Sequence, residues 1–259
     1  MSRLFALLYG FGCYLFFFAV FLWFIVFVGD FVVPGVVAKT ISHGAPAGGI
    51  GAAAWDIALL SLFGLQHSVM ARAGFKAWWT RIVPSHVERS TYVLASAVVL
   101  AFAMWQWQPV AGVVWQVEAA SASYLLWGAF GFGWALIFLA TFLTDHFELF
   151  GLRQVYLNFV RKTYTHVPFR TLFVYRYVRH PMMLGLLIAF WSVPTMTLGH
   201  LVFSVVFSLY VLIGVHFEER GLLKVMGPEY LNWRARTPML VPFGRGSAGA
   251  QASGERSAR

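Results

Sequence analysis

The sequence contains few of the residues that hold soluble and secreted domains together. Its 259 residues include one cysteine, Cys13, and 10 acidic residues, and charged residues make up 11% of the chain. A single cysteine cannot form an intramolecular disulfide, and we interpret Cys13 as a small apolar residue inside a helix. A soluble globular domain has about 25% charged residues. The composition therefore excludes a disulfide framework and argues against a soluble domain.

The sequence is instead rich in long apolar runs. Hydrophobic residues make up 59% of the chain. Five stretches contain no Asp, Glu, Lys or Arg: Leu4–Gly29, Ile57–Ala71, Ser90–Val117, Ala119–Thr144 and Pro181–Phe217. A helix needs about 20 apolar residues to cross a membrane. The second run reaches this length only if Ala52–Asp56 joins it, and the last is long enough for two short helices joined by a tight turn near residues 194–200. We predict an all-α, polytopic membrane bundle of five to six transmembrane helices, six by our count, that ends in a membrane hairpin.

Basic residues are distributed unevenly between the two sides of the predicted bundle. With six crossings and the N-terminus inside, Lys39 is the only one of the 19 Lys and Arg residues that falls outside. Lys and Arg are retained on the cytoplasmic side of short loops. We therefore predict an integral protein of the bacterial inner membrane with both termini in the cytoplasm. Contact with anionic membrane lipids accounts for the net charge of +9, so nucleic acid is not needed as a partner.

The chain is predicted to form one domain. The first apolar run is longer than the hydrophobic region of a signal peptide and is expected to remain as the first helix. We predict a single integral membrane domain over residues 1–243. Residues 244–259 are rich in Gly, Ser and Ala and are expected to form a flexible tail, because they contain too little apolar surface to fold. The sequence does not indicate an oligomeric state.

Polar and ionisable side chains gather at the predicted cytoplasmic ends of the helices. Such residues are costly in a membrane and persist mainly where they face a cavity, a partner or a ligand. The outer ends offer little beyond Asp56, Glu118 and His200. The inner ends carry Gln66, His67, Asp145, His146, Glu148, Arg179, His180, His216, Glu218 and Glu219. We therefore expect a site that opens to the cytoplasm.

The fourth apolar run ends in a polar stripe. Thr141, Thr144, Asp145 and Glu148 are spaced so that their side chains share one face of a helix. The stripe could line a site. Alternatively, Asp145 and Glu148 cap the end of the helix and pair with Arg153. The sequence leaves both readings open.

The last apolar run has charged residues at both ends. Pro181 suits the first position of a helix, and the backbone N–H groups that follow it could bind an anion. Gly185 would allow another chain or a ligand to approach closely. Glu218 and Glu219 come at the return end. A hairpin would bring these carboxylates close to Pro181 and the two residues before it.

These motifs together resemble a known group of membrane enzymes. The C-terminal blocks are Arg179-His180-Pro181-x-x-x-Gly185, Glu218-Glu219-Arg220-x-Leu222 and Met226-Gly227-Pro228-Glu229-Tyr230. They resemble the core of the isoprenylcysteine carboxyl methyltransferase superfamily, although that superfamily often has an aromatic residue where Met183 stands. Upstream blocks around Gln66-His67-Ser68 and Asp145-His146-Phe147-Glu148 are similar, more narrowly, to the bacterial methanethiol S-methyltransferases of the nurim-like branch. The resemblance covers about residues 63–243.

The resemblance implies a cofactor and a location for it. S-adenosylmethionine would bind at the cytoplasmic end of the hairpin, in a core over about residues 141–243 that includes the cytoplasmic tail. Arg179 would pair with the carboxylate of the cofactor. The implied cofactor-binding residues are Arg179, His180, Pro181, Gly185, Glu218, Glu219 and Tyr230.

The resemblance also implies a reaction, in which a small thiol, methanethiol, is methylated to dimethyl sulfide. Alkyl thiols are weaker acids than cysteine, whose pKa is about 8.5, so the site must deprotonate the thiol or stabilise the thiolate electrostatically. Asp145, His146 and His180 are the candidate catalytic residues. Gln66, His67, Thr141 and Glu148 are the candidate substrate-binding residues, and no metal is expected.

Other functions remain open. A related enzyme could methylate another lipophilic thiol or a carboxylate, such as a prenylated one. A non-enzymatic membrane scaffold like nurim would not need the cluster of ionisable residues. Haem ligation by His67, His146 and His216 would need facing histidines in mid-membrane, whereas these lie at predicted helix ends.

Overall fold

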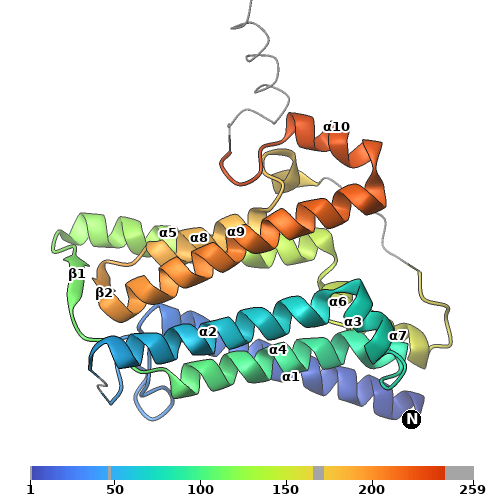
Figure 1. Ribbon diagram of the computed structural model, residues 1–259, viewed down its shortest axis with the longest axis horizontal. Coiled ribbons are helices and arrows are strands. Elements are labelled where there is room, and N and C mark those ends of the chain that lie inside the picture. The colour runs from blue at the N-terminus through green and yellow to red at the C-terminus, as the bar shows by residue number, and fades with distance from the viewer. Residues whose placement is uncertain (1, 46–47, 166–171, 243–259) are drawn as a thin grey trace, which may run out of the picture.

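The computed structural model describes residues 2–45, 48–165 and 172–242, so the predicted tail at 244–259 lies outside the described residues. The described chain is a bundle of helices with one small sheet (Figure 1). Its elements are α1 (Arg3–Val28), α2 (Gly49–Ala71), α3 (Ala73–Trp79), α4 (Ser85–Gln106), β1 (Val113–Gln116), α5 (Ala120–Thr144), α6 (His146–Leu149), α7 (Leu152–Phe159), the 3-10 helix η1 (Phe173–Arg176), α8 (Pro181–Trp191), β2 (Thr195–Thr197), α9 (Leu198–Met226) and α10 (Pro228–Arg236).

The predicted fold class is confirmed. Within the described residues, α1, α2, α4, α5 and α9 are long and apolar enough to cross a membrane. Helix α2 starts at Gly49, so the residues before Ile57 extend the second apolar run to spanning length, as predicted. The protein is therefore an integral membrane protein with a polytopic helical bundle.

The first arm of the C-terminal hairpin differs from the prediction. Helix α8 has 11 residues, which gives it a length of about 17 Å, shorter than the roughly 30 Å of a membrane core. The chain continues as β2, which pairs antiparallel with β1. Pro194 disfavours helical backbone at Val193, and the β-branched Thr195 and Thr197 favour extended backbone. The predicted turn region is therefore partly a strand, and the long helix α9 begins inside it.

The two ends of the bundle differ in charge. The N-terminus, α3, α7 and α10 lie toward one end, and β1 and β2 lie at the other (Figure 1). The basic segments that follow α2, α5 and α9 are all at the first end. Lys39 lies at the opposite end, where its ammonium group donates a hydrogen bond to the carbonyl of Trp105 near the end of α4. This separation agrees with the predicted distribution of basic residues.

Helices α5 and α8 cross at very short range. A Cβ atom added to Gly133 would lie 2.6 Å from the carbonyl oxygen of Gly185, and one added to Gly185 would lie 2.6 Å from that of Gly133. Both contacts are with backbone, which cannot rotate away. The crossing therefore requires glycine on both helices, and it fixes the position of α8 relative to α5.

We predict that Gly133→Ala destabilises the protein by about 1–3 kcal/mol, because the added methyl group forces the two helices apart. Thermal unfolding of the purified protein in detergent measures this. Gly131→Ala is the matched control, because it lies on the same helix and its added Cβ has no atom within 4 Å. Equal melting temperatures for the two variants would show that the close crossing contributes nothing to stability.

Candidate active site

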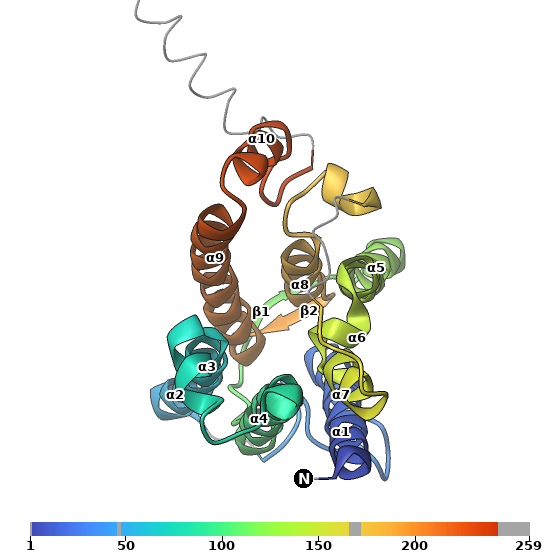
Figure 2. The same ribbon diagram turned by 90° about the vertical axis from the view of Figure 1, so that its right-hand side faces the viewer.

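A cavity of about 470 Å³ lies inside the bundle, within the size range of small-molecule sites. Figure 2 shows α9, α8 and α5 on one side of the bundle and α2, α4 and α1 on the other, and side chains from both sides line the cavity. Most of them are aromatic or aliphatic. Its polar lining residues are His67, Arg89, Tyr92, Ser96, Thr141, Thr144, His146, Tyr175, Arg179, His180, Tyr210 and Glu218.

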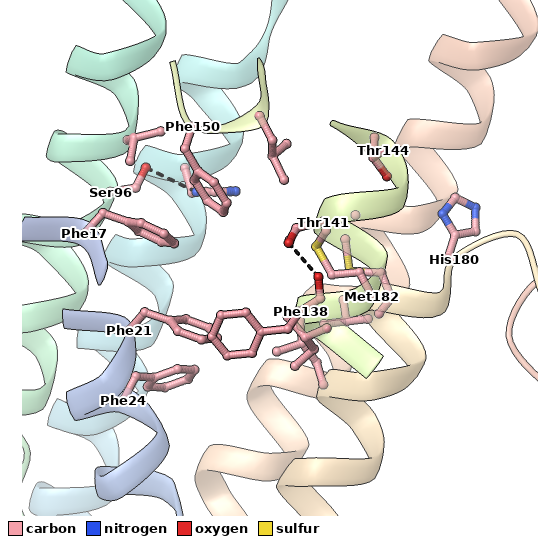
Figure 3. Close-up of a pocket in the computed structure, with 18 of the residues that line it drawn as sticks. Phe17, Phe21, Phe24, Ser96, Phe138, Thr141, Thr144, Phe150, His180 and Met182 are labelled. Atoms are coloured by element: carbon pink, nitrogen blue, oxygen red, sulfur yellow. Dashed lines mark hydrogen bonds between the residues drawn. The ribbon is translucent and has the colours of Figure 1, made fainter. Parts of the chain in front are cut away.

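Phenylalanines of α1 form one wall of the cavity. Phe17, Phe21 and Phe24 follow one another along α1 and line the cavity, and Phe21 lies next to Phe138 of α5 (Figure 3). The ring centroids of Phe21 and Phe138 are 5.1 Å apart, with the rings edge to face. From its sequence, α1 was predicted only to be a membrane span. Their i, i+4, i+7 spacing puts these three residues on one face of the helix, but α1 is apolar on all sides, so the spacing gave no signal in the sequence.

The two ends of the hairpin meet, as the sequence predicted, in a buried cluster of charges. Arg179 and Glu219 are 5% and 8% exposed, and the Arg179 Nε atom donates to Glu219 Oε1 at 2.7 Å. The same oxygen lies 3.3 Å from His180 Nε2. Burying an ion pair is favourable only when the remaining donors and acceptors are also satisfied. Here Glu219 satisfies both basic side chains.

Arg179 also fixes the C-terminal segment. Its Nη1 atom donates to the carbonyl oxygen of Arg234 at 3.1 Å and to that of Thr237. Its backbone N–H donates to the carbonyl of Pro238 at 2.9 Å. We expected Arg179 to bind the carboxylate of the cofactor, but its guanidinium is already held by Glu219 and two carbonyls. Arg179 therefore links the start of α8 to α9 and to the C-terminal segment at this end of the cavity, and its contact with the cofactor carboxylate stays a prediction.

Glu218 differs from its neighbour Glu219. Its side chain is 49% exposed, lines the cavity and lies 3.5 Å from His180 Nδ1, measured from Oε2. Successive residues of a helix point in different directions, so one carboxylate is buried with Arg179 while the other faces the cavity. Pro181 also lines the cavity, at the first position of α8. Glu218, His180 and Pro181 thus share the end of the cavity where the hairpin closes.

Two other predicted cofactor residues lie outside the cavity lining. Gly185 faces Gly133 of α5, so its lack of a side chain serves helix packing and not ligand approach. Tyr230 of α10 is fully buried. Burial, together with the nearby Glu219 carboxylate, raises the pKa of the Tyr230 hydroxyl to about 12. Gly185 and Tyr230 are therefore packed next to the residues that line the cavity and do not line it themselves.

The predicted polar stripe is interrupted at Asp145. Helix α5 ends at Thr144, and Asp145 has a left-handed backbone with φ of 105°. Its Oδ1 atom accepts a hydrogen bond from the Glu148 backbone N–H at 3.0 Å and so caps α6. The change of direction leaves Thr141 and Thr144 on the cavity and Asp145 outside its lining.

Glu148 is also directed elsewhere. Its Oε2 atom accepts from Arg153 Nη1 at 2.9 Å, and its other oxygen accepts from the Tyr164 hydroxyl. The capping interpretation of Asp145 and Glu148 therefore describes the structure. Neither side chain lines the cavity, and the catalytic role expected for Asp145 and the substrate contact expected for Glu148 stay predictions. Gly151 follows α6 in left-handed conformation with φ of 86°, as expected for a residue that closes a helix.

His146 lines the cavity, and both of its ring nitrogens are hydrogen-bonded. The Thr141 hydroxyl donates to the carbonyl of Phe138 at 2.7 Å (Figure 3). That hydroxyl has one hydrogen, so it accepts the hydrogen bond from His146 Nδ1 at 2.9 Å. His146 Nε2 then accepts from the Tyr14 hydroxyl at 2.8 Å. Burial lowers the pKa of His146, which favours this neutral, fully bonded ring.

His67 forms a second polar group on the opposite wall. Its Nδ1 atom lies 3.2 Å from Ser96 Oγ, and its Nε2 atom lies 2.9 Å from the Tyr92 hydroxyl. Tyr92 and Ser96 belong to α4 and were not predicted as site residues. Gln66 donates hydrogen bonds to Met70 and Ser96 and does not line the cavity, and its substrate contact stays a prediction.

Tyr175 also lines the cavity. It comes from η1, and its hydroxyl forms a hydrogen bond of 2.8 Å with Thr144 Oγ1. The described part of the chain has no group of three or more His, Cys, Asp and Glu residues that could hold a metal ion. His216 is exposed and does not line the cavity, so the three histidines do not converge on a haem.

The chain is similar over almost its whole length to several bacterial proteins. It is 47% identical over 244 residues to a methanethiol S-methyltransferase of Mycobacterium tuberculosis, covering 94% of this chain and 98% of that protein. It is 42% identical over 243 residues to one of Crocosphaera subtropica, covering 94% of each. Nurim of Mus musculus is 33% identical over 178 residues, which are 65% of this chain and 67% of nurim. No protein-family model and no solved structure matches the chain.

Proposed function

The chain belongs to the methanethiol S-methyltransferase family, and from this we propose that it transfers a methyl group from S-adenosylmethionine to methanethiol, giving dimethyl sulfide. The protein is a methyltransferase of the nurim-like branch. The proposal rests mainly on the cavity. Glu218 lies at one end of it, and the aromatic rings of Phe17, Phe21 and Phe138 line the part that we call the aromatic chamber.

The residues at the hairpin end of the cavity suit the proposed donor. S-adenosylmethionine is a sulfonium cation that also carries an ammonium group, and when bound it supplies an electrophilic methyl group. Glu218 offers a partly exposed carboxylate, which attracts a positive charge. Met182 and Met183 add polarisable sulfur atoms to the cavity lining. We propose that Glu218, His180 and Pro181 contact the donor, while Glu219, Arg179 and Tyr230 hold them in place.

The aromatic chamber suits the proposed acceptor. Methanethiol is small and apolar, so it gains free energy by leaving water for the surface formed by Phe17, Phe21 and Phe138. The acceptor sulfur forms a bond to the methyl carbon while the bond between that carbon and the donor sulfur breaks, and the breaking electron pair stays on the donor sulfur. Holding the two small reactants in line contributes to the rate. Thr141 and His67 border this chamber.

The thiol proton must leave during the reaction. Of the three residues that the sequence suggested as its acceptor, His146 and His180 line the cavity and Asp145 does not. Both ring nitrogens of His146 are hydrogen-bonded. The ring of His180 lies between the carboxylates of Glu218 and Glu219.

The proposed function is tested with purified protein, methanethiol and S-adenosylmethionine that carries a deuterated methyl group. Mass spectrometry of the headspace should detect dimethyl sulfide containing one labelled methyl group, in amounts equal to the S-adenosylhomocysteine formed. A panel of larger thiols and of a prenylated carboxylate distinguishes the alternative acceptors. Absence of any methylated product with folded, cofactor-binding protein would support a non-enzymatic scaffold.

We also propose that residues 1–243 act as one domain in the bacterial inner membrane, because helices from both halves of the chain line one cavity. The basic end of the bundle, which includes both described ends of the chain, would face the cytoplasm. The donor is made there and could reach His180 and Glu218.

We predict that a reporter active only in the periplasm gives no signal when it is fused to the C-terminus. The basic residues at the end of α9 and in α10 oppose translocation of this segment. The same reporter fused after Gly35, in the loop that follows α1, is the control and should give a strong signal. The reverse pattern would place the basic end of the bundle in the periplasm and would contradict the predicted orientation.

A further inference from the structure

Arg89 is a cavity-lining cation whose terminal nitrogens have no partner in the described chain. It lies near the start of α4, and its Nε atom donates to the carbonyl of Leu149 at 2.9 Å. Its Cζ atom lies 5.3 Å from the centre of the Tyr92 ring. Within residues 2–45, 48–165 and 172–242, no hydrogen bond or ion pair reaches its Nη1 or Nη2 atoms.

The other arginines near the site are already paired. Arg179 is bound by Glu219, and Arg153 is bound by Glu148. A guanidinium on the wall of a largely apolar cavity is costly unless an anion accompanies it. The Leu149 carbonyl and the Tyr92 ring fix Arg89 without neutralising it. Binding of a small anion beside Arg89 would therefore be favourable, because the anion would neutralise its charge.

We infer that Arg89 binds the thiolate form of the acceptor and makes it available at neutral pH, an inference that rests on the proposed function. An opposite charge within about 4–6 Å lowers the pKa of an acid by 1–3 units. The same effect activates cysteine thiols that lie beside basic residues. Arg89 thereby does by electrostatics what a general base would otherwise do.

The neighbouring histidines do not offer an equivalent. His146 Nε2, the basic nitrogen of that ring, is covered by the Tyr14 hydroxyl. The His67 nitrogens lie against Tyr92 and Ser96. Removing a proton through either ring would first require breaking one of these hydrogen bonds. Arg89 requires no such rearrangement, because no hydrogen bond from the described part of the chain occupies its Nη atoms.

The position of Arg89 also suits the acceptor. Arg89 and Ser96 are seven residues apart on α4 and so lie on one face of it. Ser96, Phe17 and Phe150 are on one side of the cavity and His180 and Met182 are on the other (Figure 3). In-line transfer places the attacking sulfur opposite the leaving sulfur. A donor held at the His180 side would leave the Arg89 side for the thiolate.

The step balances without a base in the protein. The thiol ionises and its proton passes to solvent, while Arg89 keeps its own protons and holds the thiolate. The thiolate sulfur then forms the new bond to the methyl carbon, and the electron pair of the broken bond stays on the donor sulfur. One proton is released to solvent for each methyl group transferred.

Steady-state kinetics of Arg89→Gln test this inference. We expect kcat/KM for methanethiol near pH 7 to fall about 10- to 1000-fold, because a thiol pKa that is lower by about 1–3 units raises the thiolate fraction by that factor. The affinity for S-adenosylmethionine, measured by calorimetry, should not change. The defect should shrink as the pH rises toward the pKa of the free thiol, because the thiolate then forms unaided. Trifluoroethanethiol, a stronger acid, should show a smaller defect than methanethiol at the same pH.

Two further variants make the result decisive. Arg81→Gln removes an exposed arginine just before α4 that does not line the cavity, and it should behave as wild type. Arg89→Lys keeps the charge and should retain more activity than Arg89→Gln; it also carries the test if Arg89→Gln does not fold. A defect that is the same at every pH and for both thiols would overturn the inference in favour of a structural role.

Weakened cofactor binding would also overturn the inference, because it would assign Arg89 to the carboxylate of the donor. Failure of the wild-type protein to methylate any thiol is a different outcome, because it would contradict the proposed function itself. The Arg89 comparison is therefore made only after wild-type turnover has been measured.

Discussion

Replacing Glu219 with alanine is expected to destabilise the folded protein by about 3–5 kcal/mol. The variant would leave Arg179, which is 5% exposed, without its counter-charge. It would also remove the hydrogen bond that Glu219 accepts from His180. An uncompensated buried charge costs much more than the pair contributes when it is intact, so the contact between α8, the end of α9 and the C-terminal segment should fail.

Thermal unfolding in detergent and the yield of folded protein measure this effect. Glu218→Ala is the matched control, since it removes the same group one residue earlier from a side chain that is 49% exposed. We expect that variant to unfold near the wild-type temperature. If both variants unfold at the same temperature, the buried cluster does not hold this end of the bundle together.

Replacing Glu218 with glutamine is expected to weaken S-adenosylmethionine binding about 10- to 100-fold, while stability stays close to that of the wild type. A hydrogen bond or contact to a charged group contributes about 1.5–3 kcal/mol, and each 1.4 kcal/mol is a factor of ten in affinity. Glutamine keeps the size of the side chain and removes only its charge. The prediction therefore tests the carboxylate that faces the cavity.

Calorimetric titration of the two forms with S-adenosylmethionine gives the result directly. S-adenosylhomocysteine is a useful second ligand, because it lacks the sulfonium charge and should lose less affinity in Glu218→Gln. Unchanged affinity for S-adenosylmethionine would remove Glu218 from the donor site. The pair of adjacent carboxylates would then have no role beyond that of Glu219 in the fold.

The sequence predicted the bundle because apolar run length is a strong signal for membrane-spanning helices. It did not predict that α8 ends after 11 residues. That boundary depends on the extended backbone around Pro194 and on pairing with β1, a strand about 80 residues earlier in the chain. Hydrophobicity is the same in both conformations, so the apolar run could not distinguish a helix from a strand there.

The candidate site was predicted in part, for a similar reason. The sequence placed His146, His180 and Glu218 at one end of the bundle, and all three line the cavity. It also placed Asp145 there, on the assumption that α5 continues. The left-handed backbone at Asp145 changes the direction of the chain, and helical spacing no longer applies after that residue.

The residues that the sequence analysis missed are on helices that appear ordinary in isolation. Phe17 lies in a run that is apolar on all sides, and Arg89 is one of the basic residues that the predicted distribution of charges already explained. Only the packing of α1 and α4 around the same space gives either residue a role. Such roles depend on tertiary contacts between distant segments, which local patterns do not encode.

The central claim is that one cavity holds the donor at its α8–α9 end and the acceptor at its α4 side. The structure of the protein with S-adenosylhomocysteine bound tests it most directly. The claim predicts that the ligand lies inside the cavity, in contact with His180 and Glu218, with its sulfur directed toward Thr141 and Arg89. A ligand bound outside the bundle, without contact to His180 or Glu218, would contradict the claim.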